Sequence, residues 1–213
     1  MTKPHAETLE KPHLLIDTAN ETLSLAIMAD GKTLGSFSEA VFRDMAARLQ
    51  PELQNVLQSA QLQWSDLGGI LFNQGPGSFT SIRIGLAAAK ALELSLGLPI
   101  YGLNGMQALA WPHKGQGRDV TVLLEAVGTD IYTQSFDEMG KPYVEATTQS
   151  LPEALERAPA GALVVGDTSN VNIEAKTATP LAFWQLFAEG YAETPAKPAY
   201  VRPLTYKKVA HSA

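Results

Sequence analysis

One stretch constrains this chain more than any other, residues 73–85, which read Asn-Gln-Gly-Pro-Gly-Ser-Phe-Thr-Ser-Ile-Arg-Ile-Gly. A short apolar run, residues 69–72, leads into it and has the length and composition of a buried strand. Gly75 and Gly77 permit backbone angles that residues with a side chain resist, so the strand can end in a tight turn. The residues that follow predict a helix that continues to about Gly97.

A glycine turn that opens a helix has backbone N–H groups that can hold an anion. This turn is not a P-loop, because no Gly-Lys-Ser/Thr sequence closes it, and its glycine spacing differs from the dinucleotide-binding fingerprint. The residues favour a turn made for packing over a phosphate cradle. Gly75 and Gly77 belong at most to a degenerate phosphate site.

The helix after the turn is apolar around almost its whole circumference between Ile82 and Leu96. Only Arg83, Lys90 and Glu93 are charged there, whereas a surface helix keeps a wide polar face. We therefore expect both sides of the helix to be covered. The second cover is either another subunit or the rest of the same domain, and the sequence leaves both open.

Bulk composition excludes several classes of protein. The chain has 213 residues, of which 45% are hydrophobic and 18% charged, which is typical of a globular protein of one or two domains. The absence of cysteine removes disulfides, thiolate catalysis and thiolate metal sites, and agrees with a cytoplasmic location. No secretory pattern and no apolar run long enough for a bilayer are present. With a net charge of −6, direct binding of nucleic acid by this chain alone is not expected.

The order of patterns along the chain suggests a duplicated unit. A buried strand, an acidic residue, a turn and two more strands open the chain, and a similar order recurs weakly from Val120, with the third strand near Tyr143. A helix is expected between residues 44 and 60, either kinked at Pro51 or starting just before it. We predict four parts: a flexible N-terminal tail at 1–12, a first lobe at 13–111 with partner-binding helices, a smaller second lobe at 112–194, and a C-terminal tail at 195–213 that packs back on the first lobe.

In each half, one acidic residue ends the first strand. Asp17, followed by Thr18, could orient a Mg²⁺-bound water or a phosphate, but an aspartate that caps a β-turn is the favoured interpretation. Glu125 holds the corresponding place in the second half, without a hydroxyl neighbour. The four histidines lack the spacing of metal ligands, so no metal site is predicted.

Several motifs together resemble a known family. The run Gly75-Pro-Gly-Ser-Phe-Thr-x-Ile-Arg-Ile-Gly85, the opening Leu15–Ala19 and the late Pro198–Arg202 are similar to the signatures of the TsaB family, formerly YeaZ. The resemblance implies an α/β fold of the actin/Hsp70/sugar-kinase (ASKHA) superfamily, built from two duplicated ribonuclease-H-like lobes. It also implies a role in making threonylcarbamoyladenosine (t6A) in tRNA.

The resemblance further implies that the chain is a non-catalytic scaffold. Family members pair with the catalytic paralogue TsaD, help to recruit the ATPase TsaE, and form homodimers when alone. They meet tRNA only through the complex, need no cofactor and bind nucleotide at most weakly. The helices of the first lobe would supply the partner interface, through Leu49, Leu53, Ile82, Gly85, Leu86, Ala88, Ala89 and Leu92.

Departures from the family pattern favour the scaffold. TsaD holds its metal through a histidine pair where this chain has residues 43–49, and TsaB proteins usually keep one histidine where Met45 stands. The family usually has arginine at the places of Gln74 and Val127. Ligand groups have therefore drifted while the apolar helix persists.

The alternative to a scaffold is an ATP-dependent phosphotransferase or ATPase of the same superfamily that uses Asp17 and Glu125 with Mg²⁺. A third interpretation, metalloprotease activity, would need metal ligands that this sequence lacks.

Overall fold

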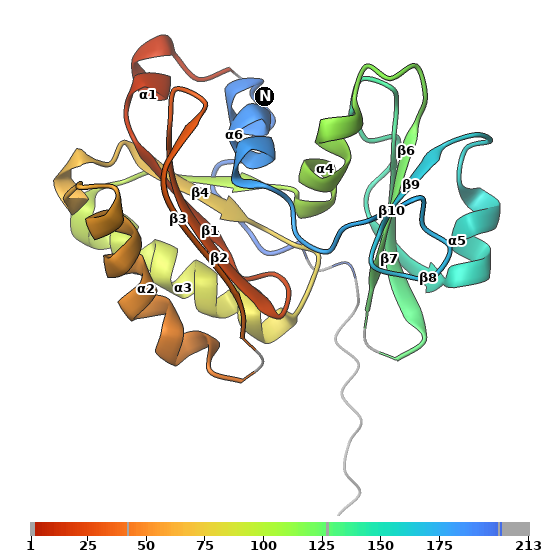
Figure 1. Ribbon diagram of the computed structural model, residues 1–213, viewed down its shortest axis with the longest axis horizontal. Coiled ribbons are helices and arrows are strands. Elements are labelled where there is room, and N and C mark those ends of the chain that lie inside the picture. The colour runs from red at the N-terminus through yellow and green to blue at the C-terminus, as the bar shows by residue number, and fades with distance from the viewer. Residues whose placement is uncertain (1–2, 42, 127, 200, 202–213) are drawn as a thin grey trace, which may run out of the picture.

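The computed structural model describes residues 3–41, 43–126, 128–199 and 201. Two five-stranded mixed sheets lie side by side, each with its own helices (Figure 1). The strands of the first sheet are β1 (His13–Asp17), β2 (Thr22–Ala29), β3 (Lys32–Ala40), β4 (Gly69–Asn73) and β5 (Ile100–Leu103). Those of the second are β6 (Val120–Glu125), β7 (Asp130–Phe136), β8 (Thr147–Ser150), β9 (Leu163–Gly166) and β10 (Ile173–Glu174).

The two sheets have the same topology, which confirms the predicted duplicated α/β fold. The first has the strand order β3-β2-β1-β4-β5, with β1 antiparallel to β2 and parallel to β4. The second has the order β10-β9-β6-β7-β8, with β6 antiparallel to β7 and parallel to β9. Read from β8, this is the order of the first sheet, so β6 corresponds to β1. Both lobes therefore have the ribonuclease-H-like strand arrangement that the resemblance implied.

Helices cover both faces of the first sheet. The helices are α1 (Ala6–Glu10), α2 (Met45–Ser59), α3 (Phe79–Leu96), α4 (Gly105–Ala110), α5 (Leu151–Arg157) and α6 (Pro180–Ala188). The 3₁₀ turns are η1 (Trp64–Asp66) and η2 (Trp111–His113). Helices α2 and α3 pack on one face and α6 on the other (Figure 1). Strand β1 accordingly contributes Leu14 and Ile16 to one core and Leu15 to the other.

Helix α4 joins the two lobes. All six of its residues are buried, and it packs against α6 as well as against β6, β7 and β9 of the second sheet. Asn104 caps it by accepting the N–H groups of Met106 and Gln107, and the same side chain donates to Gln134 Oε1 across 2.9 Å. The cap of α4 is thus also a contact between the lobes.

Three parts of the predicted organisation differ from the structure. Residues 6–10, expected in a flexible tail, form α1, because Leu9 packs on the core and its carbonyl accepts the N–H of Asp30. Helix α6 was assigned to the second lobe, but its buried aromatic face packs against strands of the first sheet. The third strand of the second half begins at Thr147 and not near Tyr143, since Asp137 accepts two backbone N–H groups and turns the chain there.

Helix α2 is continuous through Pro51, so this proline does not start the helix. Residues 202–213, most of the predicted C-terminal tail, lie outside the described residues, as does Val127. No helix in the described ranges combines the length and the apolar character needed to cross a membrane.

Candidate functional site

Asp17 ends β1 and points into the protein. It is 2% exposed, and its Oδ1 accepts hydrogen bonds from the side-chain amide of Asn73 at 2.9 Å and from the N–H of Ala19 at 3.0 Å. Burial raises the pKa of Asp17 from its ordinary value of 3.8 to about 6, although these two hydrogen bonds oppose the shift. The carboxyl group thus caps the turn after β1 and ties it to the end of β4.

The other three residues of the predicted phosphate site also lie around this point. Thr18 is fully buried and donates its hydroxyl to the carbonyl of Ser81 at 2.8 Å. Gly75 has a φ of 101° and donates its N–H to Asn73 Oδ1. A Cβ built on Gly77 would lie 2.0 Å from the carbonyl oxygen of Ala19. The structure therefore brings Asp17, Thr18, Gly75 and Gly77 together, as a closely packed junction.

Glu125 does not join this junction. It is exposed at the end of β6, and its backbone N–H donates to Asp167 Oδ1 at 2.7 Å. No described contact connects Glu125 with Asp17, and the described residues contain no group of three or more potential His, Cys, Asp or Glu ligands. The arrangement fits a structural role for Asp17 better than a pair of carboxylates around Mg²⁺.

Gln74 anchors a C-terminal strap, which we define as residues 193–199. Its side-chain oxygen accepts the N–H of Lys197 and its carbonyl accepts the N–H of Ala199, both at 2.8 Å. Glu193 exchanges two backbone hydrogen bonds with Gly102 on the edge strand β5. A Cβ on Gly102 would lie 2.2 Å from Gln74 Oε1, so the glycine makes room for this side chain. Sequence reasoning missed this role of Gln74.

Helix α3 is half covered and half exposed. Ile82, Gly85 and Ala89 face the sheet and are buried, whereas Ala87, Ala91 and Leu94 are exposed, Leu94 by 86%. The expected cover on both sides is therefore present on one side only in the single chain.

Burial also corrects the predicted set of interface residues. Leu49, Leu53, Ile82, Gly85 and Ala89 are buried inside the chain, where a partner cannot touch them. Leu86, Ala88 and Leu92 are partly buried, at the border between the two sides of α3. The error arose because apolar residues on both sides of a helix look alike in sequence.

The exposed side chains of α2 are all uncharged: Ala46, Ala47, Gln50, Pro51, Gln54, Asn55, Gln58 and Ser59. Those of α3 include one charge, and they are Thr80, Arg83, Ala87, Ala91, Leu94, Ser95 and Leu96. We call these two sets together the α2–α3 face. The two helices pack side by side on the same face of the sheet (Figure 1), so both sets point away from it.

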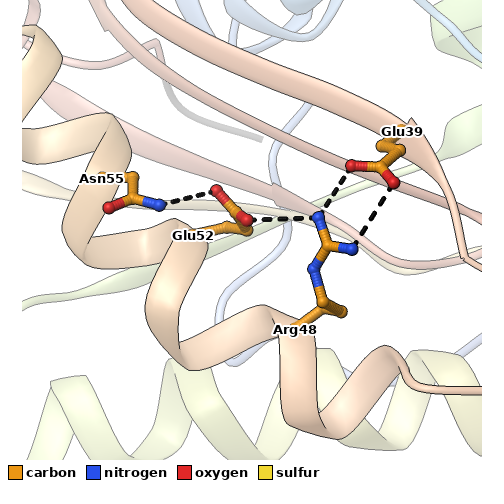
Figure 2. Close-up of polar contacts among 4 residues, drawn as sticks. All are labelled: Glu39, Arg48, Glu52 and Asn55. Atoms are coloured by element: carbon orange, nitrogen blue, oxygen red, sulfur yellow. Dashed lines mark hydrogen bonds and ion pairs between the residues drawn. The ribbon is translucent and has the colours of Figure 1, made fainter.

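The charged residues beside this face are paired with one another. Figure 2 shows Arg48 of α2 between Glu39 of β3 and Glu52 of α2, with Asn55 donating to Glu52. The Arg48 guanidinium lies 2.7 Å from Glu39 and 3.2 Å from Glu52. Ion pairs of so exposed a guanidinium contribute little stability. They do keep these charges engaged at the border of a face whose one charged residue is Arg83.

Comparison with known proteins gives the family. The TsaB protein of Escherichia coli K12, named a tRNA threonylcarbamoyladenosine biosynthesis protein, is 32% identical over 139 residues, 63% of this chain and 59% of that protein. The TsaB protein of Bacillus subtilis 168 is 28% identical over 120 residues, 56% of this chain and 52% of that protein. Residues 27–173 match the family model of TsaD, described as tRNA N6-adenosine threonylcarbamoyltransferase.

This chain belongs to the TsaB family. A solved structure of Pseudomonas aeruginosa YeaZ has the same fold, with a TM-score of 0.71 and 22% identity over 89% of this chain and 99% of the other. The alignments with the two curated TsaB proteins span only 52 to 59% of their length. The TsaB assignment was predicted from the motif at Gly75–Gly85, which here forms the packed junction and the start of α3.

Proposed function

We propose that this TsaB-family chain is a non-catalytic scaffold subunit for t6A modification of tRNA in the cytoplasm. It would pair with its TsaD paralogue, help to recruit TsaE, and pair with itself when TsaD is absent. The names of the curated relatives support a place in t6A biosynthesis. The engaged carboxyl of Asp17 supports a structural rather than a catalytic use of the junction.

The α2–α3 face carries this proposal. Interface centres are depleted in charged residues, and exposed apolar patches on soluble proteins mark interaction sites. Ala87 and Ala91 are small and Leu94 projects beyond them, so a second pair of helices can approach closely. A bundle of α2 and α3 with the equivalent helices of TsaD could bury on the order of 1,600 Å² in total.

Substitutions on this face test the proposal. Leu94→Asp and Ala91→Asp place a carboxylate at its exposed centre and should abolish co-purification with the cognate TsaD. Met139→Asp is the matched control, because Met139 is 56% exposed on the second lobe. Retention of the complex by both face variants, with folding intact, would sink this assignment of the partner surface. Loss of the complex in the control as well would point to a different surface.

The alternative is an ATPase that uses Asp17 and Glu125 with Mg²⁺. Asp17→Asn tests it cleanly, because an asparagine oxygen can still accept the N–H of Ala19. Turnover of ATP by the isolated chain that disappears in this variant, with folding intact, would establish the alternative. A lack of turnover in both proteins supports the scaffold.

A further inference from the structure

Arg83 differs from every other charged residue of α2 and α3. In these two helices Arg48 forms an ion pair with Glu52, at 3.2 Å, and Lys90 forms one with Glu93, at 2.8 Å. Arg83 is exposed, and no carboxylate among the described residues forms an ion pair with it. The α2–α3 face therefore carries one positive charge that the chain itself leaves unmatched.

Arg83 stands on the exposed ridge of α3. Ala87 and Ala91 follow it at intervals of four residues and Leu94 comes three residues later, so the four residues lie along one side of the helix. All four are exposed. The guanidinium lies over the ring of Phe79, 4.9 Å from the ring centre, which restrains the long side chain. The charge is thus held on the side of α3 that a partner would cover.

A partner that covers this ridge also takes the Arg83 guanidinium out of water. An unmatched charge is costly to bury, and an opposite charge offsets that cost only when it is well placed against the cation. The group that suits a guanidinium best is a carboxylate, which accepts two parallel N–H donors from it. Covering the ridge therefore requires a carboxylate on the partner.

The α2–α3 face of a second copy does not supply this carboxylate. In a two-fold symmetric pair the same surface of each copy meets the other, and this face has Arg83 as its one charged residue. The acids at its border, Glu39 and Glu52, are engaged with Arg48 (Figure 2). Pairing of two copies through this face would bring two guanidinium groups to an interface that holds no acid of its own.

We infer that Arg83 favours a partner that bears a carboxylate over a second copy of this chain. The partner would present an aspartate or glutamate on the helix that covers Ala87 and Ala91, and this carboxylate would pair with the guanidinium. The inference rests on the proposed scaffold role, because it concerns the same surface. Removal of the charge should then change two affinities in opposite directions, strengthening self-pairing and weakening the complex with TsaD.

Arg83→Leu tests the inference, because leucine keeps an apolar side chain beside Phe79 and removes the charge. In sedimentation equilibrium of the chain alone, this variant should pair with itself at least tenfold more tightly than the native chain does. In titrations with the cognate TsaD, it should bind at least tenfold more weakly. Arg83→Lys keeps the charge and should bind TsaD more tightly than Arg83→Leu. The control Arg118→Leu, at an exposed arginine before β6, should leave both affinities unchanged.

The two affinities distinguish failure of this inference from failure of the scaffold role. If TsaD binds the native chain and Arg83→Leu equally well, the inference is overturned while the scaffold role stands. Self-pairing that is unchanged or weaker in Arg83→Leu overturns it as well. Failure of the native chain to bind TsaD at all contradicts the scaffold role, and the inference falls with it.

Discussion

Asn73 donates its side-chain amide to Asp17 Oδ1 across 2.9 Å, and so joins the ends of β4 and β1. The same Asn73 side chain accepts the N–H of Gly75 through its own oxygen. One amide thus holds the acidic end of the first strand and the start of the glycine turn. The adjacent parallel strands of the first lobe are fixed to each other where α3 begins.

Removal of this amide should destabilise the chain. In Asn73→Ala, the buried Asp17 carboxyl loses a donor and Gly75 N–H loses its acceptor, so the free energy of unfolding should fall by about 2 to 3 kcal/mol. Urea unfolding of the native chain and of Asn73→Ala measures this loss of free energy. Asn55→Ala, which removes an exposed amide on α2, should change stability by no more than about 0.5 kcal/mol. Equal effects of the two substitutions would contradict the role of Asn73.

Asp17 should make the folded chain less stable as pH rises. Its folded pKa of about 6 exceeds the ordinary 3.8, so between these values the folded state binds more protons than the unfolded state. Stability is then lost as pH rises through this window, by about 3 kcal/mol in all. Asp17→Asn has no such titration. The native chain should therefore lose stability relative to this variant between pH 4 and pH 7, and a constant difference would contradict the buried carboxyl.

The titration of His13 should change the stability of the folded chain with pH in the direction opposite to that of Asp17. Burial lowers the pKa of the His13 ring below 6.5, although the hydrogen bond between Nδ1 and the carbonyl of Lys11 opposes the shift. Its Nε2 is buried and has no partner among the described residues. The folded state therefore disfavours the charged ring, and stability is present above pH 6.5 and lost as pH falls from there toward the folded pKa. NMR titration of the His13 ring should give a pKa below 6.5. A value at or above 6.5 would contradict the enclosure between β1 and α6.

Alanine substitutions at Gly77 and Gly97 distinguish the cost of a steric clash from the cost of backbone strain. A methyl group at Gly77 meets the backbone of Ala19 at 2.0 Å, whereas Gly97 has a φ of 70° with open space around it. Gly97→Ala should cost about 1 kcal/mol from the left-handed backbone alone. Gly77→Ala should cost distinctly more, because main-chain atoms must move. Chemical unfolding of both variants measures this, and the reverse ranking would mean that the loop after β1 yields easily.

The duplicated fold could be predicted because its signal is local. Each half repeats a buried strand, an acidic residue, a turn and a second strand, and Asp17 and Glu125 do end β1 and β6. The capping role of Asp17 was also the favoured interpretation, since Asp commonly bonds the backbone two residues on. The Asn73 donor could not be derived, because residues 17 and 73 meet only through the pairing of β1 with β4.

The placement of α6 shows what local patterns leave out. Its aromatic face, with Phe183, Trp184 and Phe187, predicts burial but does not say which sheet it covers. Position in the chain suggested the second lobe, whereas contacts with His13 and Tyr101 place it on the first. Which residues of α3 lie on its exposed side could not be predicted for a related reason, since Leu94 is as apolar as the buried Ile82.

The most direct test of the scaffold role is reconstitution with the cognate TsaD, in which complex mass and threonylcarbamoyl transfer to tRNA are measured together. The scaffold account predicts a stoichiometric complex that supports transfer, no ATP hydrolysis by this chain alone, and loss of both complex and transfer in Leu94→Asp. Absence of any complex, together with Mg²⁺-dependent ATP turnover by the isolated native chain, would contradict it and return Asp17 to an active site.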